Sequence, residues 1–238
     1  MSVLDGPVKA TTPMTETILA RRSIRSGFSG EALRPRVVEE ILACGLSAPS
    51  SKNSRPWRLH AVSDRELLAR LADAVVAHRG RATYVPHDPS TGLPRPEYRS
   101  TVVDSGEVLR QVPLAIFIEN LGPFSRGLEG LVAADEKGLR SAIFGYGLEM
   151  VGIGAAIENM WLAANALGLG AALLGDVAII EKDVAAALGM AGDLVGVLAV
   201  GESSHSPVPP MDSPAMPGVS RVVSHPAAVV MSSPDPNS

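Results

Sequence analysis

The sequence predicts a globular α+β protein, because helical and strand patterns are mixed along a chain long enough for one sizeable core. The chain has 238 residues, of which 46% are hydrophobic, which is typical of a globular protein of one or two domains. Continuous apolar runs at residues 113–119 and 194–200 predict two buried strands. Leucine and valine recur at helical spacing after Asp64, which predicts an amphipathic helix.

Each expected element follows from its apolar spacing and from the residues at its ends. In chain order we expect a short helix over residues 16–21 capped by Thr15, a helix over 34–45, a loop over 48–56, a strand over 59–62, a helix over 65–77 capped by Asp64, a strand over 113–119, a long helix over 139–167, a short extended run after Gly170 and a strand over 194–200.

Proline and serine content divides the chain into a central domain and two flanking segments. We expect a lead-in over residues 1–14, a domain over 15–201, and an extended Pro/Ser-rich tail over 202–238. Inside the domain, residues 78–111 carry many prolines and no clear period, and such a long loop is usually functional. The segment is therefore expected to be an insertion or a lid.

Composition excludes several classes of function. The net charge is −4, and without a basic excess or polybasic run we expect no nucleic-acid or membrane partner. Cys44 is the single cysteine, so neither an internal disulfide nor a multi-cysteine metal site is possible. The five histidines show no ligand spacing, so no metal is expected. The N-terminus has no apolar signal core, and a cytoplasmic location is expected.

The first candidate site is a basic cluster formed by Arg21, Arg22, Ser23 and Arg25, just before a Gly-containing loop. Guanidinium groups and a hydroxyl so close together can hold a phosphate dianion through bidentate, charge-assisted bonds. The alternative is a solvated basic turn.

The second candidate site is the Ser/Asn/Pro-rich loop over residues 48–57. Asn53 offers a donor and an acceptor, and Arg55 offers donors only. This pair suits the pyrimidine edge of a flavin, where Arg55 would stabilise the charge that develops on reduction. The alternative is a surface loop anchored by Trp57.

The third candidate site is the Gly-Leu-Gly run at residues 168–170 and the segment that follows it to Asp176. Small residues allow the backbone to approach a planar ring closely. The alternative is a helix C-cap followed by a strand. The spacing is not a dinucleotide fingerprint, and no G-x-S-x-G elbow occurs in the sequence.

Taken in order, three motifs resemble the nitroreductase family of FMN enzymes over residues 15–62 and 113–201. They are Arg-Arg-Ser-x-Arg, the loop Ala-Pro-Ser-Ser-x-Asn-Ser-x-Pro-Trp and the late Gly-Leu-Gly. The resemblance implies that the basic motif grips the FMN phosphate, that the loop contributes from the partner subunit, and that the segment after Gly-Leu-Gly lies against the ring. The residues implied are Arg21, Arg22, Ser23, Arg25, Pro49, Ser50, Ser51, Asn53, Arg55, Leu173, Leu174, Gly175 and Asp176.

Two departures from the family pattern concern basic residues. Arg55 stands where the family usually has glutamine. The family usually closes the phosphate site with a further basic residue near the C-terminus, and Arg221 is the only lysine or arginine of the tail that could do so. The resemblance further implies a three-layer α/β/α fold with a mixed sheet, built as an intertwined homodimer. It implies an enzyme that transfers electrons from NADH or NADPH to a small conjugated acceptor such as a nitroaromatic or a quinone.

A homodimer is also expected because the helix over residues 139–167 is apolar on nearly every face, which one subunit would struggle to cover. The alternative is a central core helix within one subunit. Two rival functions use the same cofactor. One is an FMN-dependent dehydrogenase that desaturates a peptide or small metabolite, and the other is a non-catalytic FMN-binding protein.

Overall fold

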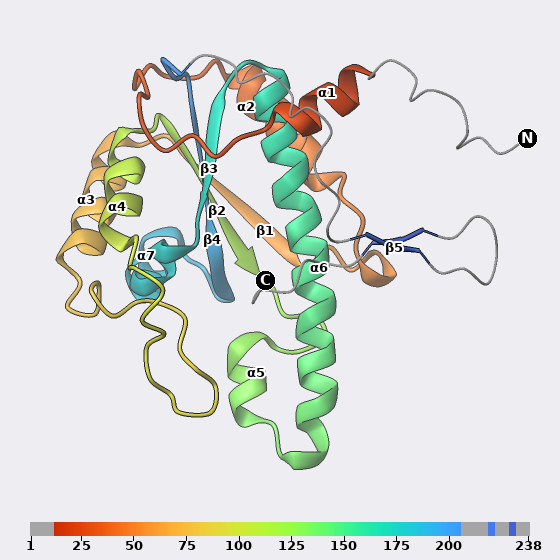
Figure 1. Cartoon of the computed structure of the whole chain (residues 1–238). Coiled ribbons are helices and arrows are strands. Elements are labelled where there is room, and N and C mark those ends of the chain that lie inside the picture. Colours follow the sequence, from red (N-terminus) through yellow and green to blue (C-terminus); the bar gives the residue numbers. More distant parts are fainter. Residues whose placement is uncertain (1–11, 206–218, 222–228, 232–238) are drawn as a thin grey trace, which may run out of the picture.

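Helices cover both faces of one β-sheet (Figure 1). In this computed structural model, which describes residues 12–205, 219–221 and 229–231, the strands and helices follow one another in mixed order. The elements are α1 (Pro13–Ala20), α2 (Pro35–Leu46), the 3-10 helix η1 (Ser51–Asn53), β1 (Trp57–Val62), α3 (Arg65–Ala77), α4 (Val102–Gln111), β2 (Leu114–Asn120), α5 (Gly127–Ala133), α6 (Glu136–Ala166), β3 (Gly170–Leu174), the 3-10 helix η2 (Gly175–Ile180), α7 (Glu181–Leu188), β4 (Asp193–Gly201), β5 (Val219–Arg221) and β6 (Val229–Met231).

The main sheet has the strand order β1-β2-β4-β3, and every neighbouring pair is antiparallel. The expected mixed sheet is therefore wrong for these strands; the one parallel contact in the described part is an isolated bridge between Ser23 and Ala171. The mixed sheet was expected from the family resemblance; the apolar runs predict only burial on both faces, which this antiparallel sheet achieves because helices cover it on both sides. A separate pair, β5 and β6, is also antiparallel.

The alternation of side chains along β2 divides the core into two halves. Leu114, Ile116 and Ile118 pack toward α2 and α6, whereas Ala115 and Phe117 pack toward α3, α4 and α7. Successive side chains of a strand point to opposite faces, so a fully buried strand must be covered on both. This arrangement confirms the three-layer α+β architecture.

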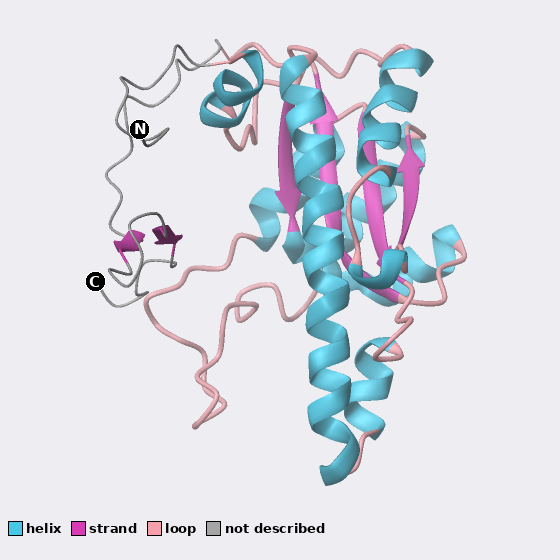
Figure 2. Cartoon of the chain, turned by 90° about the vertical axis from the view of Figure 1, so that its right-hand side faces the viewer, coloured by secondary structure: helices cyan, strands magenta, loops and turns pink. Residues whose placement is uncertain are grey.

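The longest helix, α6, runs along one face of the sheet and continues past its end, where α5 lies beside it (Figure 2). It begins three residues earlier than expected, at Glu136, because Asp135 accepts a hydrogen bond from the Gly138 amide at 2.7 Å. Much of its outer face is exposed to solvent in the single chain: Phe144 is 68% exposed and Val151 is 74% exposed.

Helix starts follow their capping residues. Asp64 caps α3 as predicted, accepting bonds from the amides of Glu66 and Leu67 at 3.0 Å each. The predicted cap of α1 is wrong: Thr12 caps it and accepts from the Thr15 amide at 3.2 Å. Proline at the first helical position needs no amide partner, so the helix starts at Pro13.

Residues 78–111 form a loop only in their first part, because α4 occupies their end. Val108 and Leu109 of α4 are buried against α3. Gly106 weakens the helical pattern in the sequence, yet a Cβ there would lie 2.7 Å from Val76 Cγ2, so glycine lets the two helices approach. The Pro-rich segment is therefore the loop between α3 and α4. The wider division into lead-in, domain and tail stays a prediction, since most of its flanking residues lie outside the described part.

Candidate functional site

The basic cluster begins where α1 ends, at its C-cap Arg21. The Arg21 guanidinium lies over the Trp161 ring, 4.5 Å from its centroid, and its Nε lies 3.3 Å from Glu158 Oε1. Both partners belong to α6. Arg22 donates to the carbonyls of Leu19 and Arg21 at 2.7 and 2.8 Å, so its charge is directed back to the backbone.

Ser23 and Ile24 bring this cluster to the edge of the sheet. Ser23 forms its parallel bridge with Ala171 of β3, and the Ile24 amide donates to the Ala171 carbonyl at 2.9 Å. A Cβ on Gly170 would lie 3.0 Å from Ile24 Cγ2, which explains the glycine at this crossing. The first and third candidate sites, far apart in sequence, are therefore adjacent within one chain.

Several predicted polar side chains are left with free hydrogen-bonding capacity. Within the part of the chain that the structure describes, no hydrogen bond or ion pair engages the side chains of Ser23, Arg25, Ser51, Asn53 and Arg55. Trp161 Nε1, beside Arg21, and Ser54 Oγ are buried without a partner. A polar ligand would satisfy such groups, which otherwise carry a desolvation cost.

The Ser/Asn/Pro loop has an unusual backbone. Lys52, Asn53 and Arg55 all have positive φ, at 50°, 53° and 45°, a region that costs non-glycine residues roughly 1–3 kcal/mol each. The Arg55 amide donates to Ser50 Oγ at 2.9 Å and closes the loop. Pro49 is exposed, and Ser51 begins η1. Strain of this kind gathers at functional sites.

The structure does not bring this loop to the basic cluster. Ser50 faces Gly152 of α6, where an added Cβ would lie 3.2 Å from Ser50 Cβ, whereas Arg21 contacts Trp161. These α6 residues are nine positions apart, which corresponds to about 14 Å along the axis and to opposite sides of the helix. The loop and the basic cluster are therefore separate in one chain.

The segment after Gly-Leu-Gly divides into a sheet part and an open part. Leu174 is 1% exposed in the core and Leu173 packs toward α6. Gly175 has no atom within 4 Å of an added Cβ, so it faces open space. The Asp176 carboxylate accepts from Thr101 Oγ1 at 2.6 Å and from Ser105 Oγ at 3.0 Å, both at the start of α4.

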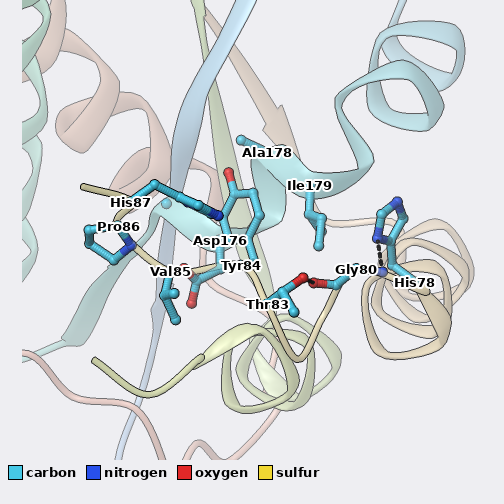
Figure 3. A pocket seen from close by; sticks show the side chains of 11 residues that line it. His78, Gly80, Thr83, Tyr84, Val85, Pro86, His87, Asp176, Ala178 and Ile179 are labelled. Atoms are coloured by element: carbon cyan, nitrogen blue, oxygen red, sulfur yellow. Dashed lines mark hydrogen bonds between the residues drawn. The ribbon is translucent and has the colours of Figure 1, made fainter. Parts of the chain in front are cut away.

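Gly175 and Asp176 line a cavity of about 780 Å³ with one end of the Pro-rich loop (Figure 3). Its wall consists of His78, Gly80, Thr83, Tyr84, Val85, Pro86, His87, Gly175, Asp176, Ala178 and Ile179. This volume suits a small organic ligand. Sequence reasoning assigned no role to Tyr84 or His87, although the length of their loop was the signal that could have found them.

One predicted site residue can be placed only in part. Arg221 lies in β5, but its side chain is outside the described part of the structure, so its role at the phosphate stays a prediction. Among the described residues no group of three or more His, Cys, Asp or Glu could hold a metal. No helix in that same part of the chain is long and apolar enough to cross a membrane.

The fold and the adjacent motifs define an α+β protein with a candidate composite site at one edge of its sheet. Residues 18–202 match the nitroreductase family model, and the chain belongs to this family of oxidoreductases. It is 28% identical over 200 residues to 5,6-dimethylbenzimidazole synthase of Rhodospirillum rubrum, covering 81% of this chain and 83% of that one.

Other similarities agree with this assignment. A candidate NADH dehydrogenase/NAD(P)H nitroreductase of Archaeoglobus fulgidus is 27% identical over 158 residues, 66% of this chain; the match spans 64% of the relative's length. The fold resembles that of the NADPH:FMN oxidoreductase from Vibrio harveyi complexed with NAD+, with a TM-score of 0.57, 19% identity, and coverage of 87% of this chain and 74% of the other.

Proposed function

We propose that this chain is an FMN-dependent oxidoreductase that takes electrons from NADH or NADPH and passes them to a small conjugated acceptor. The observation that carries the proposal is the junction of the basic cluster with β3, immediately before Gly175 and Asp176 open onto the cavity. One end of this junction offers cationic and hydroxyl donors, and the other offers open backbone beside a ligand-sized space.

The residues of this edge fit a phosphorylated flavin. Arg21 and Ser23 would hold the phosphate, since a guanidinium and a free hydroxyl both donate to phosphate oxygens. Arg25, exposed and unpaired among the described residues, would add positive charge. The backbone from Leu173 to Asp176 would lie against the ring, where Gly175 leaves room for it. When bound, FMN would supply hydride and electron transfer, while the protein supplies orientation and electrostatics.

The separation of the loop from the basic cluster supports a homodimer. Asn53 and Arg55 suit the polar edge of the ring, yet they lie by the middle of α6, away from Arg21. A second copy of the chain would supply this loop to the site from outside. The site is then complete only in the dimer, with each copy contributing its loop to the other.

The outer face of α6 is suited to such an interface. Phe144 and Val151 are largely exposed, and between and beyond them an added Cβ on Gly147 or Gly154 meets no atom within 4 Å. Large apolar residues beside open glycines allow close packing of a second helix, and an apolar stripe of this kind is unusual on a free surface.

We further propose an order of reaction in which donor and acceptor share this cavity. Its volume of about 780 Å³ accommodates one aromatic ligand at a time beside a bound ring. Donor and acceptor would then alternate in the same space, and ping-pong kinetics would be expected.

The test is the visible spectrum of the purified protein followed by anaerobic mixing with NADH and NADPH. We expect flavin absorbance near one FMN per chain, fast bleaching by one of the nicotinamides, and reoxidation by a quinone or nitroaromatic. Bleaching by dithionite alone would contradict the reductase and favour FMN sequestration. Failure to bind FMN even after reconstitution would overturn the whole assignment.

A further inference from the structure

The cavity wall carries one carboxylate and no permanently cationic side chain. Of the residues that line it, Asp176 alone has a carboxylate, and none is lysine or arginine. Figure 3 shows Tyr84, His87 and Asp176 at one end of the cavity and His78 at the other. Arg81 belongs to the same loop but donates to the His78 carbonyl at 3.3 Å, and so points to backbone.

The negative charge of Asp176 is not neutralised by its partners. Its hydrogen bonds come from the uncharged hydroxyls of Thr101 and Ser105, and within the described residues it forms no ion pair. Those bonds fix the orientation of the carboxylate but leave its charge. Glu181, at the start of α7, likewise forms no ion pair among the described residues, and its Oε1 accepts a hydrogen bond from the Leu194 amide at 2.6 Å.

The field of these two carboxylates acts on the Tyr84 phenol. The pKa of the Tyr84 phenol is raised by burial and then by the charges of Asp176 and Glu181. The phenol therefore stays protonated at neutral pH and can donate a hydrogen bond. Its ring adds an aromatic face to the wall, and such a face attracts both planar ligands and cations.

We propose that this cavity selects neutral or cationic aromatic acceptors over anionic ones, with Asp176 and Tyr84 as the residues that determine this specificity. An anionic acceptor would meet Asp176 with no lysine or arginine in the wall to offset the repulsion. A cationic ring would gain from the carboxylate and from the Tyr84 face. This inference rests on the proposed function, because it places the acceptor in the cavity beside the flavin.

The first experiment compares three nitrobenzenes that differ only in their para group. These are 4-nitrobenzyltrimethylammonium, 4-nitrobenzyl alcohol and 4-nitrobenzoate, mixed at pH 8 with protein already reduced by dithionite. We expect the cation and the alcohol to reoxidise the flavin at least tenfold faster than the anion. In Asp176→Asn, which keeps an acceptor for both hydroxyls, the cation-to-anion ratio should fall about tenfold.

A matched control separates a local charge from net charge. Glu97→Gln removes one negative charge from the same loop, in an exposed ion pair with Arg95 outside the cavity wall, and should leave the ratio unchanged. An equal fall of the ratio in both variants, or no fall in Asp176→Asn, would overturn the proposal.

The second experiment measures binding without turnover. Benzyltrimethylammonium, benzyl alcohol and benzoate are titrated calorimetrically into the holoprotein. Asp176→Asn should shift the ratio of cation to anion dissociation constants about tenfold, whereas Tyr84→Leu should weaken all three several-fold. Because Tyr84 is 39% exposed on a loop, its variant should fold normally.

The same titration separates failure of this inference from failure of the proposed function. If the protein binds no flavin, the proposed function fails, but titration of the apoprotein still decides whether the cavity discriminates by charge. Equal binding of the three ligands would contradict the selection.

Discussion

The basic cluster and the Ser/Asn/Pro loop are both rich in polar groups, but only the basic cluster contacts the rest of the candidate site within one chain. Ser23 and Ile24 are paired with Ala171 of β3, and Arg21 is held by Trp161 and Glu158 of α6. The loop instead presents Asn53 and Arg55 outward with positive φ and no side-chain partner in the described part of the chain. This difference is the basis of our proposal that one chain builds half of the site and offers the other half to a second copy.

The largest expected effect comes from Val151→Glu on the outer face of α6. In a monomer this substitution would change stability by no more than about 0.5 kcal/mol, because Val151 is 74% exposed. In a dimer it buries an unpaired charge, which costs several kcal/mol. We expect loss of the dimer by light scattering and loss of bound FMN on dialysis.

The matched control for this change is Leu93→Glu, which alters a residue that is 64% exposed in the Pro-rich loop. It should leave both mass and flavin content as in the wild type. A Val151→Glu protein that keeps the dimer mass and its bound FMN would show that α6 does not form the interface that joins the two halves of the site.

The next largest effect is expected from the basic cluster, the half of the proposed site that is anchored within one chain. Arg21→Ala removes the proposed phosphate contact, and a lost charge-assisted bond is worth about 1.5–3 kcal/mol. FMN affinity should therefore fall roughly 10- to 150-fold, as measured by fluorescence titration of the apoprotein. Arg36→Ala, at an exposed position of α2, serves as the control. Equal affinity in the two variants would remove Arg21 from the phosphate site.

A smaller effect is expected from the Ser/Asn/Pro loop, the half of the proposed site that points outward. Arg55→Gln should lower the two-electron potential of the flavin and slow its reduction, because a fixed positive charge stabilises the reduced, anionic ring. A charge pair at about 4 Å is worth on the order of 4 kcal/mol near a surface before desolvation. If about 1.4 kcal/mol of this interaction energy remains after desolvation, its loss lowers the two-electron potential by about 30 mV. FMN stoichiometry should not change, and Arg34→Gln should leave the potential in place. A potential that rises would place Arg55 elsewhere.

The smallest effect tests whether the loop is strained. Lys52→Gly removes the cost of positive φ at a non-glycine residue, so thermal unfolding should occur at a higher temperature by the equivalent of about 1 kcal/mol. The control is Lys182→Gly in α7, where glycine at a helical position should instead lower stability by a similar amount. Destabilisation in both variants would show that the Lys52 backbone carries no strain.

Much of the fold follows from local patterns. The runs of apolar residues at β2 and β4 predicted buried strands, and Asp64 predicted the start of α3. These predictions succeed because burial and capping are decided by residues within a few positions of one another. The start of α1 was predicted less well, since Thr12 and Thr15 are both capable caps and only Pro13 decides between them.

The candidate site was predictable as a set of residues and not as an arrangement. The motifs give the chemistry of Ser23, Asn53 and Arg55, but the sequence does not state which of them meet. The pairing of Ser23 with Ala171, and the distance of Ser50 from Arg21 along α6, arise from how the helices pack. The hydroxyl contacts of Asp176 also depend on α4, whose helical pattern was hidden by Gly106 and by the prolines before it.

By itself the sequence determined the family, the buried strands and the hydrogen-bond donors of the candidate site, because these depend on residue type and short-range order. The tertiary structure decided the antiparallel direction of the sheet, the cavity beside Gly175 and the separation of the loop from the basic cluster. Such features depend on contacts between residues far apart in the chain, and the free energy of those contacts is fixed only when whole helices and strands pack together.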